Sequence, residues 1–178
     1  VAGMPMYNEE ETIGSVVTRT LRYVDEVICI DDGSSDASAR IAEACGATVI
    51  RHRVNRCYGG ALKTLFLEAT NLDADALVLL DSDGQHETGD IPKLLKPILE
   101  GEADFAIGSR FVDGGGGTDM PAYRRLGIKV ITAASNLSSE LGIKDTQSGF
   151  RAFSRTALER LRFDSEGMEL SLEMLEDA

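Results

Sequence analysis

The sequence has few of the residues that build thiolate metal sites or disulfide frameworks. It contains no tryptophan, two histidines and three cysteines. Cys29, Cys45 and Cys57 are widely spaced and form no CxxC pair, which argues against a zinc site. An odd and sparse cysteine count is typical of a reducing, cytoplasmic compartment. We expect Cys29, in an apolar run, to be a core residue, and His52 and His86 to be ordinary loop residues.

Basic residues and long apolar runs are scarce as well. The chain has 18 Lys and Arg against 30 Asp and Glu, a net charge of −12, which argues against a nucleic-acid partner bound by phosphate neutralisation. No stretch approaches the ~20 apolar residues that span a bilayer, and we expect no signal peptide within these residues. Because the chain starts at Val1 without an initiator methionine, we interpret residues 1–178 as one domain cut from a longer protein.

What is present is an alternation of short β-branched runs with helical patterns. This order predicts an α/β fold, a Rossmann-like sandwich with a mostly parallel central sheet in a single domain. We expect strands near residues 1–4, 27–30, 48–50, 76–80, 103–107 and 150–153. We expect helices near residues 36–45, 61–69 and 90–100, with Gly46 ending the first of these.

Two further helices are predicted from local signals. Asn8 is a good N-cap, and acidic residues 9–11 would fill the first turn of a helix that starts there. Between Tyr123 and Leu141, apolar residues recur at three to four positions, which predicts an amphipathic helix. On that helix Arg125, Lys129 and Thr132 would share one face.

Polar clusters follow three of the expected strands, where an open parallel sheet binds its ligands. The sharpest is Asp81-Ser82-Asp83, whose two carboxylates, with Gln85 nearby, offer hard oxygen ligands to a divalent ion. Such an ion can neutralise a diphosphate leaving group. The alternative interpretation is a solvated turn capped by carboxylates.

The cluster Asp31–Asp36 also follows a strand, and a carboxylate there can accept hydrogen bonds from a ribose or a base edge. The alternative is a turn in which Asp36 only caps a helix. Arg110 ends a later strand, where its guanidinium would contact a phosphate or form a surface ion pair. The segment 122–162 is locally basic, which is consistent with a docking surface for an anionic acceptor or for lipid headgroups. The alternative interpretation is a solvated polar face.

Together these stretches resemble the inverting family 2 glycosyltransferases of the GT-A fold, and most of all the dolichyl- or polyprenyl-phosphate hexosyltransferases. The resemblance covers nearly the whole chain, and its motifs run in family order. One departure is Cys57, where the family often has glycine. The matching stretches are Pro5–Glu9, Asp31–Asp36, Tyr58–Leu62, Asp81–Gln85, Gly108–Arg110 and Asp145–Arg151.

The resemblance implies roles for individual residues and for partners. It implies Mg²⁺ or Mn²⁺ as cofactor, a nucleotide-sugar donor linked to UDP or GDP, a polyprenyl or dolichyl phosphate acceptor, and work at the cytoplasmic face of a membrane. The implied metal ligands are Asp81, Asp83 and Gln85. The implied nucleotide-binding residues are Pro5, Tyr7, Asn8, Glu9, Asp32, Lys63, Asp81 and Ser82. The implied catalytic residues are Asp83, Arg110, Arg124, Arg125, Asp145 and Arg151, and the implied acceptor-binding residues are Lys129, Gln147 and Ser148.

An ionised acceptor phosphate needs no strong general base, so positioning and charge neutralisation would carry catalysis. A sugar hydroxyl as acceptor would need a carboxylate base, for which Asp145 is the candidate. Three rivals are weaker. A phosphohydrolase with a nucleophilic first Asp of the DxD pair usually carries that motif near the chain start. No GxGxxG or P-loop marks a dinucleotide oxidoreductase or a P-loop nucleotide site. A non-catalytic nucleotide-sugar-binding module would not need both Asp81 and Asp83.

Overall fold

A computed structural model describes residues 1–109, 127–131 and 149–160, of which 109 and 127–131 are described by their backbone alone. The described part forms a seven-stranded sheet with the order β3-β2-β1-β4-β7-β5-β6. The strands are β1 (Ala2–Met6), β2 (Val27–Asp31), β3 (Thr48–Arg51), β4 (Ala76–Leu79), β5 (Phe105–Ser109), β6 (Gly127–Ile131) and β7 (Arg151–Ser154). The helices are α1 (Ile13–Thr20), α2 (Ser38–Ala44), α3 (Cys57–Asn71), η1 (Thr88–Asp90), α4 (Ile91–Leu99) and α5 (Arg155–Arg160).

The sheet is mostly parallel, as predicted. Strands β1, β2, β3 and β4 are parallel neighbours, and β5 runs in their direction because β7 lies antiparallel between β4 and β5. β6 is antiparallel to β5. The carboxyl ends of β1, β2, β3 and β4 therefore meet along one edge of the sheet, where the sequence places its polar clusters.

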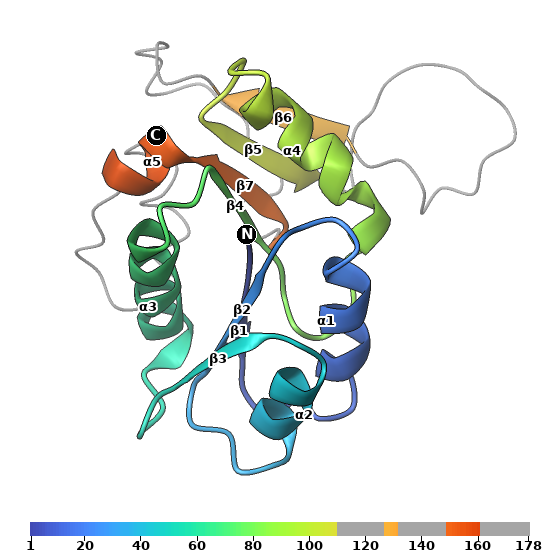
Figure 1. Ribbon diagram of the computed structural model, residues 1–178, viewed down its shortest axis with the longest axis vertical. Helices are drawn as coiled ribbons and strands as arrows, with labels where there is room; N and C mark the ends of the chain where they lie inside the picture. Colours follow the sequence, from blue (N-terminus) through green and yellow to red (C-terminus); the bar gives the residue numbers. More distant parts are fainter. Residues whose placement is uncertain (110–126, 132–148, 161–178) are drawn as a thin grey trace, which may run out of the picture.

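Helices cover both faces of the sheet, with α1, α2 and α4 on one side and α3 and α5 on the other (Figure 1). The alternation of side chains along each strand explains the two cores. In β4, Ala76 and Val78 pack toward α1 and α4, whereas Leu77 and Leu79 pack toward α3. Cys29 is fully buried in the first of these cores, as the sequence predicts.

Two predicted helices differ in the structure. The chain around Asn8 is not helical, because Asn8 adopts a left-handed conformation with φ of 56° and α1 starts only at Ile13. Within the predicted helix from Tyr123 to Leu141, residues 127–131 instead form β6. Ile128, Val130 and Ile131 are β-branched and pair with β5, so strand pairing overrides the helical spacing of the apolar residues.

Candidate donor-binding site

A cavity of about 360 Å³ lies beyond the carboxyl ends of β1, β2 and β4. Asp32 follows β2 and Asp81 follows β4, so they lie about two strand spacings, roughly 10 Å, apart with β1 between them. Pockets of this size with a few convergent polar side chains are the usual sites for small-molecule ligands. It is lined by Pro5, Met6, Tyr7, Glu9, Asp32, Asn55, Cys57, Tyr58, Ala61, Asp81, Ser82 and Asp83.

At the β2 end of the cavity, Asp32 is almost fully buried and its Oδ1 accepts two hydrogen bonds. One comes from the backbone N–H of Arg56 at 2.8 Å, and the other joins His52 Nδ1 at 2.7 Å. Its own backbone N–H donates to the Met6 carbonyl, which fixes the loop to β1. The prediction that His52 is an ordinary loop residue is therefore wrong, because its ring supports a cavity carboxylate.

At the β4 end, the Asp81-Ser82-Asp83 turn is tied to β1. The buried Ser82 hydroxyl donates to the Pro5 carbonyl at 2.9 Å. Gly84 takes a φ of 77°, which favours glycine, and so turns the chain back beside the carboxylates. The Gln85 backbone N–H then donates to Asp83 Oδ1 at 2.9 Å. The turn therefore holds both carboxylates at the cavity while they stay partly exposed.

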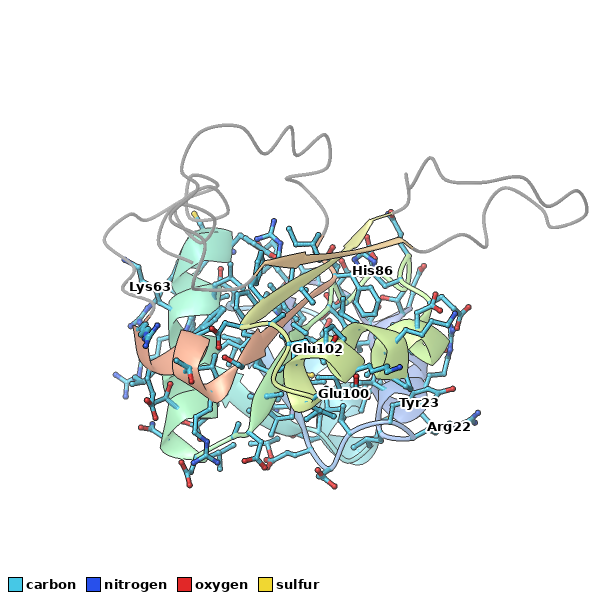
Figure 2. All side chains as sticks on the ribbon, turned by 90° about the horizontal axis from the view of Figure 1, so that it is seen from above. Arg22, Tyr23, Lys63, His86, Glu100 and Glu102 are labelled. Carbon is cyan, nitrogen blue, oxygen red and sulfur yellow. The ribbon has the colours of Figure 1, made fainter. Side chains whose placement is uncertain are left out.

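The Asp81 carboxylate is also supported from behind by two other parts of the chain. His86 Nε2 lies 3.0 Å from Asp81 Oδ2, and the imidazole stacks on Phe150 with ring centroids 5.4 Å apart. Gly149 packs so closely on Asp81 that a Cβ there would overlap the carboxylate. Figure 2 shows His86 close to the ends of strands of the β5–β7 part of the sheet. His86 therefore also differs from its prediction as an ordinary loop residue.

Tyr58 lies between the carboxylate turn and β7. Burial, together with the negative charge of Asp81, raises the pKa of its phenol to about 12, and the Arg151 guanidinium opposes that shift. Arg151 is buried in β7, opposite Leu79 and Ile107 in the sheet register. Its positive charge thus lies in the sheet beside the carboxylate end of the cavity.

Cys57 begins α3 with a φ of 62°, a conformation that favours glycine. A glycine at this position would adopt the same conformation without strain. The thiol is exposed and lines the cavity beside Tyr58.

Three of the residues predicted to bind nucleotide or metal do not line the cavity. The Asn8 side chain instead accepts a hydrogen bond from the Ser35 backbone at 2.9 Å and so orders the loop after β2. Lys63 lies at the outer edge of α3 (Figure 2). Gln85 is exposed and meets the site through its backbone.

The other predicted site residues fall mainly outside the described part of the chain. Lys129 belongs to β6, where its backbone pairs opposite Ile107. The residues that lie outside the described ranges are Arg110, Arg124, Arg125, Asp145, Gln147 and Ser148.

The donor atoms suit a divalent cation that is shared with a ligand. Within the described ranges, no three His, Cys, Asp or Glu side chains converge as a complete metal site. Asp81 and Asp83 nevertheless both line the cavity. Two carboxylates completed by substrate phosphates are the usual arrangement for Mg²⁺. The residues therefore fit a cation that binds together with a phosphorylated ligand.

None of the described helices is long and apolar enough to cross a bilayer.

Comparison with known proteins places this geometry in a family. The profile of "Glycosyl transferase family 2" matches residues 2–162. The UDP-N-acetylglucosamine–dolichyl-phosphate N-acetylglucosaminyltransferase of Methanococcus voltae is 32% identical over 89% of this chain and 70% of its own length. The dolichol-phosphate mannosyltransferase of Pyrococcus furiosus is 32% identical over 97% of this chain and 51% of its own length.

A solved structure agrees with the fold. Glucosyl-3-phosphoglycerate synthase from Mycobacterium tuberculosis, in complex with Mn²⁺ and UDP-glucose, superimposes with a TM-score of 0.71 and 30% identity. The match covers 99% of this chain and 62% of that structure, so this chain spans less than two thirds of the solved relative. The fold is thus the GT-A fold predicted from the sequence. By the extent of the profile match and by these relatives, the chain belongs to glycosyl transferase family 2.

Proposed function

We propose that the chain is the catalytic domain of a metal-dependent, inverting hexosyltransferase that moves a sugar from a nucleoside diphosphate to a polyprenyl or dolichyl phosphate. The observation that carries this proposal is the cavity itself. One end holds a buried, fully oriented carboxylate, Asp32, and the other holds the partly exposed pair Asp81 and Asp83. A nucleoside diphosphate has the matching polarity, with a hydrogen-bonding base at one end and a charged diphosphate at the other.

Each end has a chemical task in this proposal. Asp32 accepts a hydrogen bond from the donor nucleoside, and the exposed ring of Tyr7 lies beside it in the cavity wall. Asp81 and Asp83 would hold Mg²⁺ or Mn²⁺, which supplies positive charge to the diphosphate leaving group. Arg151 adds a fixed positive charge near the same end, as its effect on Tyr58 indicates.

The reaction that fits is a single displacement. A phosphate oxygen of the acceptor forms a bond to the anomeric carbon while the bond from that carbon to the diphosphate oxygen breaks, which inverts the configuration. The products are a hexosyl phosphate lipid and a free nucleoside diphosphate. The attacking phosphate is already ionised near neutral pH, so the protein supplies orientation and charge rather than a base.

The relatives support a lipid-linked acceptor. The Methanococcus and Pyrococcus proteins are named as transferases to dolichyl or dolichol phosphate, and a further relative in Mycolicibacterium smegmatis is a polyprenol monophosphomannose synthase. In this proposal the basic segment 122–162 collects the anionic acceptor at the cytoplasmic face of a membrane.

One observation favours a second candidate acceptor. Another complex of the solved glucosyl-3-phosphoglycerate synthase contains phosphoglyceric acid together with Mn²⁺ and UDP-glucose, and it superimposes with a TM-score of 0.71 and 26% identity. An acceptor of that type would react through a hydroxyl group and would need a base. Asp145, the candidate base, lies outside the described residues.

Sugar transfer from radiolabelled UDP- and GDP-sugars tests the function. The chain would be incubated with Mn²⁺ and either polyprenyl phosphate in detergent or phosphoglyceric acid. We expect label in the organic phase with polyprenyl phosphate, and none with EDTA or with Asp83→Ala. Label only in a water-soluble phosphoglycerate product would favour the second candidate. Metal-dependent nucleotide binding without any turnover would indicate a non-catalytic module.

A further inference from the structure

His52 is buried beside the cavity, and the proposed sugar transfer assigns it no role. His52 is the first residue after β3, and Asp32 is the first residue after β2. These strands are parallel neighbours with Asp31 opposite Arg51, and the His52 backbone N–H donates to the Asp31 carbonyl at 2.8 Å. The sheet register therefore brings the two side chains together at the cavity.

Both ring nitrogens of His52 have partners. Nδ1 lies 2.7 Å from Asp32 Oδ1, and Nε2 lies 2.8 Å from the Thr64 hydroxyl on α3. The side chains of His52 and Asp32 are only 5% and 6% exposed. Since an ionised carboxylate can only accept, Nδ1 carries the proton and donates to Asp32. Thr64 holds the far side of the ring, so the imidazole has one orientation.

The two oxygens of Asp32 are consequently unequal. Oδ1 accepts from both His52 and the Arg56 backbone N–H, whereas Oδ2 has no hydrogen-bond partner among the described residues. The described part of the chain contains one enclosed side-chain polar atom without a partner, and that atom is Thr20 Oγ1. Among the described residues Oδ2 is thus not an enclosed, unpaired atom, and Asp32 lines the cavity.

We propose that His52 is a positioning residue that, with the Arg56 backbone, fixes Asp32 to present a single acceptor oxygen, and that this arrangement selects a uracil nucleotide as donor. The inference rests on the proposed function and specifies its substrate class. Uracil offers one ring N–H between two carbonyl groups, which matches one acceptor. Cytosine has a lone pair at the same ring position, which a carboxylate repels.

Guanine is disfavoured for a different reason. It presents a ring N–H and an amino group side by side, and a carboxylate satisfies that pair best with both of its oxygens. In this site the Oδ1 atom of Asp32 already accepts hydrogen bonds from two donors, the buried His52 ring and the Arg56 backbone N–H. Guanine would therefore leave a donor unpaired in a poorly solvated place, which costs binding free energy.

The variant Asp32→Asn provides a test, because it should reverse the preference between UDP and CDP. His52 Nδ1 and the Arg56 N–H are both donors, so they will hold the new amide by its oxygen and turn its NH₂ group toward the cavity. The site then presents a donor in place of an acceptor. We expect the variant to bind CDP more tightly than UDP, whereas the wild-type chain binds UDP at least about tenfold more tightly than CDP or GDP.

His52→Phe tests the positioning role directly. The variant keeps an aromatic ring but removes both nitrogens, so the Asp32 carboxylate can rotate. We expect the ratio of UDP to CDP affinity to fall by about tenfold, and His52→Gln, which retains an N–H donor, to restore part of it. The double variant His52→Phe/Asp32→Asn should lose the reversed preference. His86→Phe is the matched control, because His86 supports Asp81 rather than Asp32 and should leave the ratio unchanged.

The measurement is isothermal titration of UDP, CDP and GDP in the presence of Mn²⁺, with thermal unfolding run on each variant. Wild-type binding of GDP or CDP as tight as that of UDP would overturn the inference while the proposed function stands. Retained UDP preference in Asp32→Asn, or an unchanged ratio in His52→Phe, would overturn the positioning role. If no nucleoside diphosphate binds the wild-type chain, the proposed function itself fails. The Asp32→Asn titration decides the matter even if His52→Phe does not fold.

Discussion

The two ends of the cavity hold their carboxylates in different ways, although each uses one histidine. At the end proposed to bind the base, Asp32 is almost fully buried, accepts a hydrogen bond from a backbone N–H, and is supported by His52, which is itself held by Thr64. At the end proposed to bind the diphosphate, the Asp81 side chain is 36% exposed, and its one side-chain hydrogen-bond partner among the described residues is His86. In the proposed function, the base end is thus organised before any ligand arrives, whereas the diphosphate end carries negative charge that a bound cation would balance.

The difference separates two tasks. A buried acceptor in a fixed orientation discriminates between ligands, because a wrong partner leaves it unpaired in a poorly solvated place. Exposed paired carboxylates discriminate little, but they attract a cation that a diphosphate can share. Changes at the base end should therefore alter which nucleotide binds, and changes at the other end should alter whether the diphosphate is held and cleaved.

The largest effect is expected from Asp83→Ala. Loss of one of the two cavity carboxylates should lower Mn²⁺-dependent hydrolysis or transfer of the donor by about 10²- to 10³-fold. Glu100→Ala is the control, since Glu100 is an exposed acid at the end of α4 and is not part of the cavity lining. Comparable activity loss in both variants, or loss of folding in thermal unfolding of Asp83→Ala, would contradict a direct role.

Gly149→Ala should disturb the position of the Asp81 carboxylate without removing its charge. A methyl group at Gly149 would overlap the Asp81 carboxylate and displace it. We expect turnover to fall by about 10- to 100-fold and the free energy of unfolding to fall by about 1–3 kcal/mol. Gly89→Ala is the matched control, because a Cβ there would find only ordinary contacts at 3.7 Å. Full activity in Gly149→Ala would show that Asp81 does not need its observed position.

A smaller effect is expected from His86→Phe. The variant can keep the stacking contact with Phe150 but loses the nitrogen that lies 3.0 Å from Asp81. A hydrogen bond to a charged group stabilises by about 1.5–3 kcal/mol, so the Mn²⁺-dependent affinity for a nucleoside diphosphate should fall by about tenfold or more. Titration of Mn²⁺ at a fixed nucleotide concentration measures this loss of affinity. An unchanged Mn²⁺ dependence would limit His86 to a packing role.

The smallest effect is expected in the rates at which a thiol reagent labels the cysteines. This experiment changes no residue of the chain. Burial raises the pKa of the Cys29 thiol from 9.0 to about 12, whereas Cys57 is exposed at the cavity. Near pH 8, a thiol reagent should label Cys57 in the folded chain and Cys29 only after unfolding, and bound nucleotide should slow labelling of Cys57. Labelling of Cys29 in the native chain at the rate of Cys57 would contradict its burial.

The raised pKa of Cys29 also predicts how the stability of the folded chain changes with pH. The folded-state pKa lies above the unfolded value, so the protonated thiol contributes stability that is complete below pH 9.0 and declines as the pH rises toward 12. A Cys29→Ala variant should lack this part of the alkaline decline in thermal unfolding temperature.

The sequence predicts the sheet and the chain positions of the cavity carboxylates because both follow from local patterns. Apolar runs mark the strands, and Asp32, Asp81 and Asp83 follow two of them directly. It does not predict the roles of the two histidines, since their partners depend on strand register and on packing between distant segments. His52 meets Asp32 across 20 positions, and the ring stack of His86 with Phe150 joins separate parts of the chain.

Local signals were also misleading where tertiary contacts outweighed them. Asn8 has the chemistry of a helix cap, but its side chain instead orders the loop that carries Ser34 and Ser35. The apolar spacing after Tyr123 matches a helix, yet Ile128, Val130 and Ile131 lie in a strand because β5 provides an edge to pair with. Neither outcome can be read from neighbouring residues alone.

The most direct test of the central claim compares UDP with uridine, each titrated with and without Mn²⁺. If the cavity binds a base at one end and a cation-bridged diphosphate at the other, Mn²⁺ should tighten UDP binding by at least about tenfold. Uridine, which has no diphosphate, should bind weakly and equally in both conditions. Binding of UDP that is indifferent to Mn²⁺, or uridine binding that depends on it, would contradict the division of the cavity into a base end and a diphosphate end.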